Sequence, residues 1–142
     1  MIKFTIVTIT YNAADVFMRT ADSVARQTYA AVEHLIIDGA SSDGTQNLAE
    51  EYKKASDAAC NGHEVRIVSE PDKGLYDAMN KGRRLATGDY VCFLNAGDFF
   101  PSADTLDVIA ANARLEECSS EGKPLPGVLY GDTDWVDNDG NY

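Results

Sequence analysis

Polar residues that could carry chemistry follow four short apolar runs of the sequence, and three of these four polar segments contain carboxylates. In chain order the segments are Thr8-Ile9-Thr10-Tyr11-Asn12, residues 38–45, Glu70-Pro71-Asp72-Lys73-Gly74 and Asn95-Ala96-Gly97-Asp98. Carboxylate and amide oxygens are ligands that Mg²⁺ and Mn²⁺ prefer. A bound divalent cation can bring phosphate into an acidic site. The pattern therefore favours a small phosphorylated ligand held through a metal ion.

The two familiar phosphate-binding loops are absent. Neither G-x-G-x-x-G nor G-x-x-x-x-G-K-[ST] follows the first apolar run, which removes the main sequence argument for NAD-type dehydrogenases and P-loop enzymes. A receiver-type phosphotransfer domain would need acidic metal ligands after the first run, where only Asn12 and Asp15 occur, so we rank it last. His34 and His63 stand apart from any metal-ligand spacing and are interpreted as structural.

The elements that must position these residues alternate along the chain. The predicted strands are residues 4–10, 34–38, 64–69 and 90–95. Apolar stripes of helical period occupy residues 16–24, 48–55, 75–86 and 106–113. This alternation predicts an α/β fold, with a mostly parallel sheet and helices on both faces. Ligands of such sheets bind outside the carboxyl ends of the strands, where the polar segments fall.

The last part of the sequence follows a different pattern. Residues 128–136 are predicted to form a strand and residues 137–141 a hairpin turn, yet the sequence stops at Tyr142. The returning strand is missing, so we expect an amino-terminal part of a longer protein. Asp132 and Asp134 would share one face of the predicted strand, because side chains alternate along a strand.

Composition limits the class of protein. The 142 residues, 44% hydrophobic and 25% charged, predict one globular domain. With 12 basic and 23 acidic residues the net charge is −11, which argues against nucleic acid as a partner. Three cysteines without C-x-x-C spacing are typical of reduced cytoplasmic thiols. The first apolar run is too short for a signal peptide or a membrane span, so we expect a cytoplasmic domain, with peripheral association at the inner face of a membrane left open.

Taken together, the polar segments resemble the amino-terminal half of a family 2 glycosyltransferase, an inverting nucleotide-sugar enzyme with the GT-A fold. The resemblance covers about residues 4–100 and rests on IVTITYN at 6–12, IDGASSDGT at 37–45, EPDKGLYDAMNKG at 70–82, and ATGDY through LNAGD at 86–98. It implies a truncated, Rossmann-like GT-A nucleotide-binding part. Residues 1–142 would then be one glycosyltransferase domain, with nucleotide-sugar binding in 1–100 and the start of the acceptor side in 101–142.

The resemblance implies roles for residues of the donor site. It places Thr8 and Tyr11 at the nucleotide base and makes Asp38 the acceptor for the base N–H, which favours uracil. In the same way, it places Asp72, Asp77 and Asn80 beside the nucleotide and the donor sugar.

The resemblance also implies a metal site, in which Asp98 holds Mn²⁺ or Mg²⁺ and, through the metal, the diphosphate. Positions that are often aspartate in the family are Asn95 and Gly97 here. One carboxylate makes a weaker metal site, and Asn95 would hydrogen-bond the ribose or offer its carbonyl oxygen.

Plainer interpretations exist for the same residues. Asp38 could form an Asx turn, and Asp43, with Gln46 three residues later, is accounted for as a helix cap and is left out of the site. Thr8 is a common strand residue, and Tyr11 could cover the edge of the core. An unpaired charge at Asp98, beside two aromatic residues, would be costly, which favours a metal there.

The function expected from these observations is transfer of a sugar from a nucleotide diphosphate sugar, with UDP favoured, to an acceptor hydroxyl with inversion. The expected partners are the donor and a sugar or lipid-linked saccharide acceptor, in polysaccharide or glycolipid biosynthesis. The catalytic base is expected beyond Tyr142, with Asp132 and Asp134 as weaker candidates within the chain. A non-catalytic nucleotide-sugar-binding or assembly module is the alternative.

Overall fold

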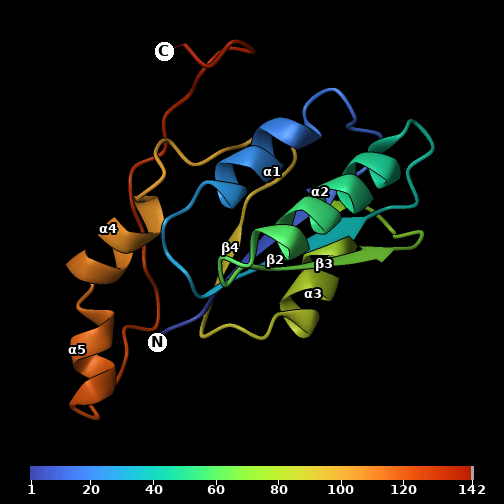
Figure 1. Cartoon of the computed structure of the whole chain (residues 1–142). Coiled ribbons are helices and arrows are strands. Elements are labelled where there is room, and N and C mark those ends of the chain that lie inside the picture. Colours follow the sequence, from blue (N-terminus) through green and yellow to red (C-terminus); the bar gives the residue numbers. More distant parts are fainter. Residues whose placement is uncertain (142) are drawn as a thin grey trace.

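The computed structural model describes residues 1–141 and contains a four-stranded sheet (Figure 1). All strands are parallel, in the order β3-β2-β1-β4. The elements are β1 Phe4–Thr10, α1 Phe17–Ala25, β2 Val32–Asp38, α2 Thr45–Ala59, β3 Glu64–Ser69, α3 Leu75–Leu85, β4 Tyr90–Phe93, α4 Thr105–Asn112 and α5 Leu115–Ser120. The four predicted strands are all present, with small differences at their ends.

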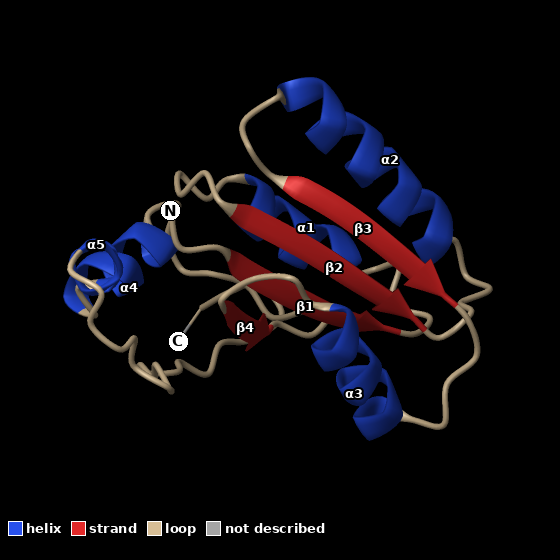
Figure 2. Ribbon diagram, turned by 90° about the horizontal axis from the view of Figure 1, so that it is seen from below, coloured by secondary structure: helices blue, strands red, loops and turns tan. Residues whose placement is uncertain are grey.

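The sheet lies between two layers of helices (Figure 2). On one face, Phe17 of α1 and Tyr52 of α2 pack with Ile36 of β2. On the other face, Ala78 of α3 packs with Val7 of β1. Because both faces are covered, β1 and β2 are buried along their whole length, as their nearly continuous apolar sequences require. The expected α/β fold with helices on both faces is confirmed.

The strand order changes direction at β1. From β1 the sheet extends to β2 and β3 on one side, whereas β4 pairs with the other side of β1. Beyond β4 the chain continues along β1, because Leu94 N donates to Val7 O (2.9 Å) and Ala96 N donates to Ile9 O (3.1 Å). Residues 95–98 therefore end beside the carboxyl end of β1, at the point where sheets of this kind bind ligands.

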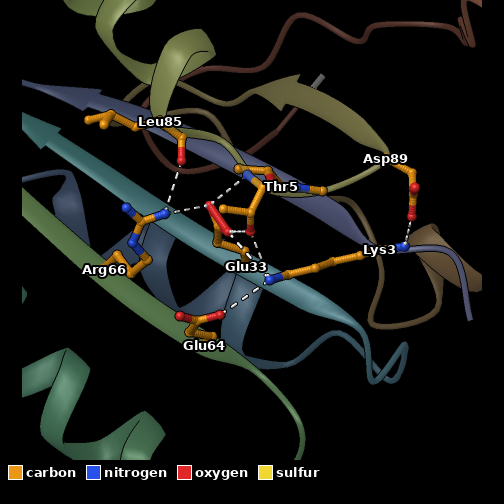
Figure 3. A network of polar contacts seen from close by, with 9 residues as sticks. Lys3, Thr5, Glu33, Glu64, Arg66, Leu85 and Asp89 are labelled. Atoms are coloured by element: carbon orange, nitrogen blue, oxygen red, sulfur yellow. Dashed lines mark hydrogen bonds and ion pairs between the residues drawn. The ribbon is translucent and has the colours of Figure 1, made fainter.

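A polar network closes the opposite, amino-terminal edge of the sheet (Figure 3). The carboxylate of Glu33 is fully buried, 3.3 Å from Arg66 Nη1 and 3.4 Å from Lys3 Nζ, and it accepts a hydrogen bond from the Thr87 hydroxyl. The backbone N–H of Lys3 donates to Asp89 (2.8 Å). A buried carboxylate needs such partners. The network lies away from the carboxyl ends of the strands, so we assign it to stability.

The predicted strand at residues 128–136 is wrong. This segment is extended but pairs with no strand within residues 1–141, and its Val128, Tyr130 and Trp135 side chains are 79, 97 and 92% exposed. A strand needs a neighbour to accept its backbone hydrogen bonds, and none lies beside this segment in the part of the chain that the structure describes.

The turn predicted at residues 137–141 is present, although Tyr142 lies outside the described residues. Gly140 N donates to Asp137 O (3.0 Å), and Arg19 Nη1 donates to Asn138 O (3.1 Å). The guanidinium of Arg19 also lies 4.2 Å from the centre of the Phe99 ring. The turn therefore packs against α1 and does not close a hairpin.

Within residues 1–141, none of the helices has both the length and the hydrophobicity that a membrane span requires.

Candidate functional site

The loops that follow β1 and β2 are bound to each other. Asn12, in the left-handed conformation with φ 46°, donates its backbone N–H to Ser41 Oγ (2.8 Å) and accepts from Ser42 N through its side-chain oxygen (2.9 Å). Asparagine tolerates this backbone conformation better than most residues. Asn12 therefore fixes the relative positions of two of the four polar segments.

Asp43 adds a second link between the same loops. One of its oxygens accepts from the backbone N–H (3.1 Å) and the hydroxyl (2.6 Å) of Thr45, at the start of α2, and the other accepts from Ala14 N (3.0 Å). These bonds, the one from the Thr45 hydroxyl above all, lower the pKa of the Asp43 carboxyl. The predicted cap at Asp43 is wrong, because Gly44 is the N-cap residue of α2 and the Gln46 side chain donates to Ser41 O (2.8 Å). Asp43 instead ties the start of α2 to the β1–α1 loop, a link that the sequence did not indicate.

Asp38, the last residue of β2, is only 1% exposed and fixed by three hydrogen bonds. Its carboxylate accepts from Ser41 N (3.0 Å), Ser41 Oγ (2.5 Å) and Ser69 Oγ (2.7 Å). The backbone bond reaches three residues on, whereas an Asx turn bonds two residues on, so Asp38 orders this loop without forming the Asx turn that the sequence offered. A carboxylate has about four acceptor positions, so one is left over for a further donor. The contact of Asp38 with a nucleotide base stays a prediction.

The side chains of Tyr11 and Asp72 both lie close to Gly39. A Cβ atom on Gly39 would lie 2.9 Å from Asp72 Oδ2 and 3.2 Å from Tyr11 Cδ2. Three loops, from the ends of β1, β2 and β3, thus converge at one point, and a larger residue at position 39 would have to displace the Asp72 side chain. The Tyr11 ring is 66% exposed and Asp72 is half-buried. An exposed aromatic ring beside a carboxylate can stack on a planar or sugar ring and accept its hydroxyl or amide hydrogens.

Asp77 and Asn80 lie at the amino-terminal part of α3, beside the same edge. Asp77 accepts a hydrogen bond from Lys73 N (2.9 Å) and so holds the loop that begins α3. Asn80 is exposed and three residues further on, which places both side chains on neighbouring positions of the helix surface. They are available to a ligand at this edge.

Thr8, in contrast, lies in the core. It is fully buried, and its Oγ1 is 2.8 Å from His34 Nε2, while His34 Nδ1 is 2.8 Å from the Tyr52 hydroxyl. Burial lowers the pKa of His34 to about 3, so its imidazole is neutral at neutral pH. The Thr8 hydroxyl is already engaged with His34, two residues before the end of β1, and we therefore leave this residue out of the proposed site.

Thr10 is the last residue of β1, two positions after Thr8. It pairs in register with Asp38 and is 2% exposed. Its Oγ1 and the Asn95 Oδ1 are the two buried side-chain oxygens of the described residues without a hydrogen-bond partner. They belong to the end of β1 and to the segment after β4, where the strand order reverses. Buried polar atoms of this kind call for a partner such as water or a ligand.

The segment 95–98 forms a tight turn that exposes Asp98. Asp98 N donates to Asn95 O (2.9 Å), and Gly97 has φ 103°, a conformation that favours glycine. Within residues 1–141, no group of three His, Cys, Asp or Glu side chains could hold a metal ion. Mg²⁺ and Mn²⁺ bind through one or two carboxylates when phosphate oxygens supply further ligands. Asp98 and the unpartnered Asn95 oxygen fit that arrangement.

Two further features complete the description of the candidate residues. Asp132 and Asp134 are exposed in the segment 128–136. A groove of about 340 Å³ runs between α1 and α2, lined by apolar side chains such as Met18 and Leu48, and no predicted site residue lines it.

Comparison with known proteins identifies the family of this chain. The family model described as glycosyl transferase family 2 matches residues 5–119, a range that contains the four polar segments. The chain belongs to this family.

Curated relatives agree with this assignment. A PGL/p-HBAD biosynthesis glycosyltransferase of Mycobacterium tuberculosis is 41% identical over 129 residues, which are 91% of this chain and 46% of that protein. The uncharacterized glycosyltransferase YibD of Escherichia coli is 32% identical over 94% of this chain and 43% of its own length. The chain thus spans about half the length of the curated relatives it matches.

Solved glycosyltransferases share the fold. The mannosyltransferase PcManGT from Pyrobaculum calidifontis, in complex with GDP-Man and Mn²⁺, has a TM-score of 0.65 and 28% identity, over 74% of this chain and 30% of that one. S. aureus TarS in complex with UDP-GlcNAc has a TM-score of 0.66 and 23% identity, over 81% of this chain and 32% of that one. The fold is therefore that of GT-A glycosyltransferases.

Proposed function

We propose that this chain is the donor-binding part of a glycosyltransferase. The enzyme would transfer a sugar from a nucleotide diphosphate sugar to an acceptor hydroxyl with inversion, in glycolipid or polysaccharide biosynthesis. The observation that carries the proposal is the convergence of Tyr11, Gly39 and Asp72 with the Asn95 to Asp98 turn at the carboxyl ends of the strands. The mycobacterial relative, whose name assigns it to PGL/p-HBAD biosynthesis, supports a glycolipid product.

The donor nucleotide is proposed to lie across the ends of β1, β2 and β3. Tyr11 offers an exposed ring for the base, and Asp38 has one acceptor position left for a base N–H. Asp72, Asp77 and Asn80 would contact the ribose and the sugar. UDP is the nucleotide we propose, and GDP is the comparison, because the solved relative PcManGT binds GDP-Man.

A divalent cation is proposed to bind with the diphosphate at Asp98 and the Asn95 side-chain oxygen. When bound, Mn²⁺ or Mg²⁺ would neutralise charge on the diphosphate and make it a better leaving group. Support comes from the donor set described above and from the Mn²⁺ complex of PcManGT. The net charge of −11 adds a reason, since an acidic protein repels a diphosphate unless a cation compensates.

The base that deprotonates the acceptor hydroxyl is proposed to belong to the part of the relatives that this chain does not span. In the transfer, the acceptor oxygen bonds to the anomeric carbon, the diphosphate leaves with the electrons of the broken bond, and the base takes the hydroxyl proton. Asp132 and Asp134 are the candidates within the chain. The acceptor is proposed to be a sugar or a lipid-linked saccharide at the cytoplasmic face of a membrane.

A non-catalytic nucleotide-sugar-binding module is the second candidate, favoured by the single carboxylate in the metal motif. Sugar transfer by a longer protein that contains this chain, and its loss in Asp98→Ala, would exclude the module.

Titration calorimetry tests the donor site. We expect UDP to bind the chain more tightly with Mn²⁺ than without, and Asp98→Ala to remove that difference, a loss of about tenfold or more in affinity. Asp57→Ala, at an exposed carboxylate on α2 that forms an ion pair with Lys53 (2.9 Å), is the matched control and should bind like wild type. Equal binding of UDP by Asp98→Ala and wild type in Mn²⁺ would contradict the metal assignment, and preference for GDP would contradict the choice of nucleotide.

A further inference from the structure

Helix α1 and the residues just after it present three buried polar side chains on one side. Thr20, Ser23 and Gln27 are 0, 2 and 4% exposed and recur at a spacing of three and four residues. Positions with this spacing share one face of a helix and are normally apolar when that face is buried. Buried polar side chains require hydrogen-bond partners, so the question is which groups these three serve.

Their partners are backbone groups of a single later segment. Ser23 Oγ accepts from Phe100 N (3.2 Å). The Gln27 side chain donates to Ser102 O (2.8 Å) and accepts from Leu106 N (3.1 Å). These two side chains therefore hold the backbone that follows the Asn95 to Asp98 turn.

Thr20 binds the turn itself, on both sides of Asp98. Its hydroxyl accepts from Gly97 N (2.8 Å) and donates to Asp98 O (2.7 Å), with Asn95 O also within reach at 3.4 Å. The backbone carbonyl of Thr20 accepts from Ser23 Oγ (2.8 Å), which links the two side chains. Gly97 is in a left-handed conformation, and the exposed Asp98 carboxylate has no side-chain bond that fixes it among the hydrogen bonds found in residues 1–141.

We propose that Thr20 is a positioning residue for Asp98. One hydroxyl, on the buried face of α1, sets the backbone conformation from which the carboxylate projects. The inference rests on the proposed function, because it assigns Thr20 to the metal and diphosphate part of that site. Positioning groups behind metal ligands typically change metal affinity when removed.

The test uses two variants of Thr20 and one matched control. Thr20→Val keeps the shape of the side chain but leaves Gly97 N–H and Asp98 C=O without their partner, whereas Thr20→Ser keeps the hydroxyl. Thr28→Val removes a hydroxyl that donates to Asp107 Oδ2 (2.5 Å) and lies 3.2 Å from Ala103 O, both beyond the turn. All three are compared with wild type after thermal unfolding has established that each variant is folded.

The readout is the ratio of the UDP affinity with Mn²⁺ to the UDP affinity without it. If Thr20 had a purely structural role, its substitution would not change this ratio. We expect Thr20→Val to lower this ratio roughly tenfold or more, with metal-free UDP binding unchanged. Thr20→Ser should restore the ratio, and Thr28→Val should leave it at the wild-type value. If Thr20→Val weakens binding equally with and without Mn²⁺, or leaves both unchanged, the positioning role is wrong.

Amide hydrogen exchange at Gly97 separates failure of this inference from failure of the proposed function. Protection of the Gly97 N–H in wild type and its loss in Thr20→Val would support the positioning of the turn, even if wild type bound UDP without any response to Mn²⁺. UDP binding by wild type that does not respond to Mn²⁺ would instead overturn the metal part of the proposed function. Unchanged exchange at Gly97 in Thr20→Val would overturn the positioning role.

Discussion

Single residues at the strand ends have distinct tasks that depend on their burial. Asp38 is buried and orders the loops around it, Tyr11 is exposed beside Gly39, and Asp98 projects from a turn. The sequence predicted that these residues gather at one edge, because polar residues follow each buried strand. The family resemblance placed Thr8 there as well, but in the structure its hydroxyl bonds to His34 inside the core. Thr10, with its unpartnered hydroxyl at the end of β1, was not singled out, because a motif does not indicate which strand hydroxyls already have partners.

His34 makes stability depend on pH. Burial lowers its pKa to about 3, below the ordinary value of 6.5, so the unfolded chain binds a proton that the folded chain does not. The contribution of His34 is therefore fully present above pH 6.5 and is lost as the pH falls from 6.5 towards 3, by up to about 1.4 kcal/mol per pH unit.

Urea unfolding between pH 7.5 and 4.5 measures this dependence. His34→Gln, which cannot titrate, should have a shallower slope of unfolding free energy against pH than wild type. His63→Gln, at a half-buried histidine whose charge also contributes to the lowered pKa of His34, is the comparison and should change the slope less than His34→Gln, because burial is the larger cause of that shift. Identical slopes for His34→Gln and wild type would show that His34 is not the group responsible.

Among the elements, α1 and α3 position the site from opposite faces of the sheet. The apolar stripes predicted both helices, and the alternation of strands and helices predicted their layers. The polar side of α1 went unrecognised, because Thr20, Ser23 and Gln27 bond to backbone some 75 residues later in the chain, and no local pattern signals such partners. The strand predicted at 128–136 failed for a related reason: its β-like sequence has no neighbour to pair with in residues 1–141.

Close contact between α3 and β1 depends on Gly82. A Cβ atom there would overlap the Val7 side chain in the buried core. We expect Gly82→Ala to lower the free energy of unfolding by about 1 to 3 kcal/mol through overpacking. Chemical denaturation measures this, with Gly127→Ala, where a Cβ meets open space, as control. A Gly82→Ala protein as stable as wild type would contradict the close packing.

The whole molecule is an acidic α/β domain whose ligand edge and stabilising network lie at opposite ends of one sheet. Sequence motifs were sufficient to predict the family and the fold, since four motifs in order coincide with four strand ends. The choice of nucleotide, the acceptor and the catalytic base stay predictions. Because the chain spans about half the length of its curated relatives, completion of the acceptor side is expected from the remaining half.

The central claim, that the donor binds where strand order reverses, is tested most directly by NMR spectroscopy of the chain titrated with UDP and Mg²⁺, then with traces of Mn²⁺. We expect the largest amide shift changes at Tyr11, Gly39 and Gly97, and the strongest broadening by Mn²⁺ at Gly97 and Asp98. Changes concentrated in the groove between α1 and α2 or in the Glu33 network, or no change at Tyr11, Gly39 and Gly97, would contradict the claim.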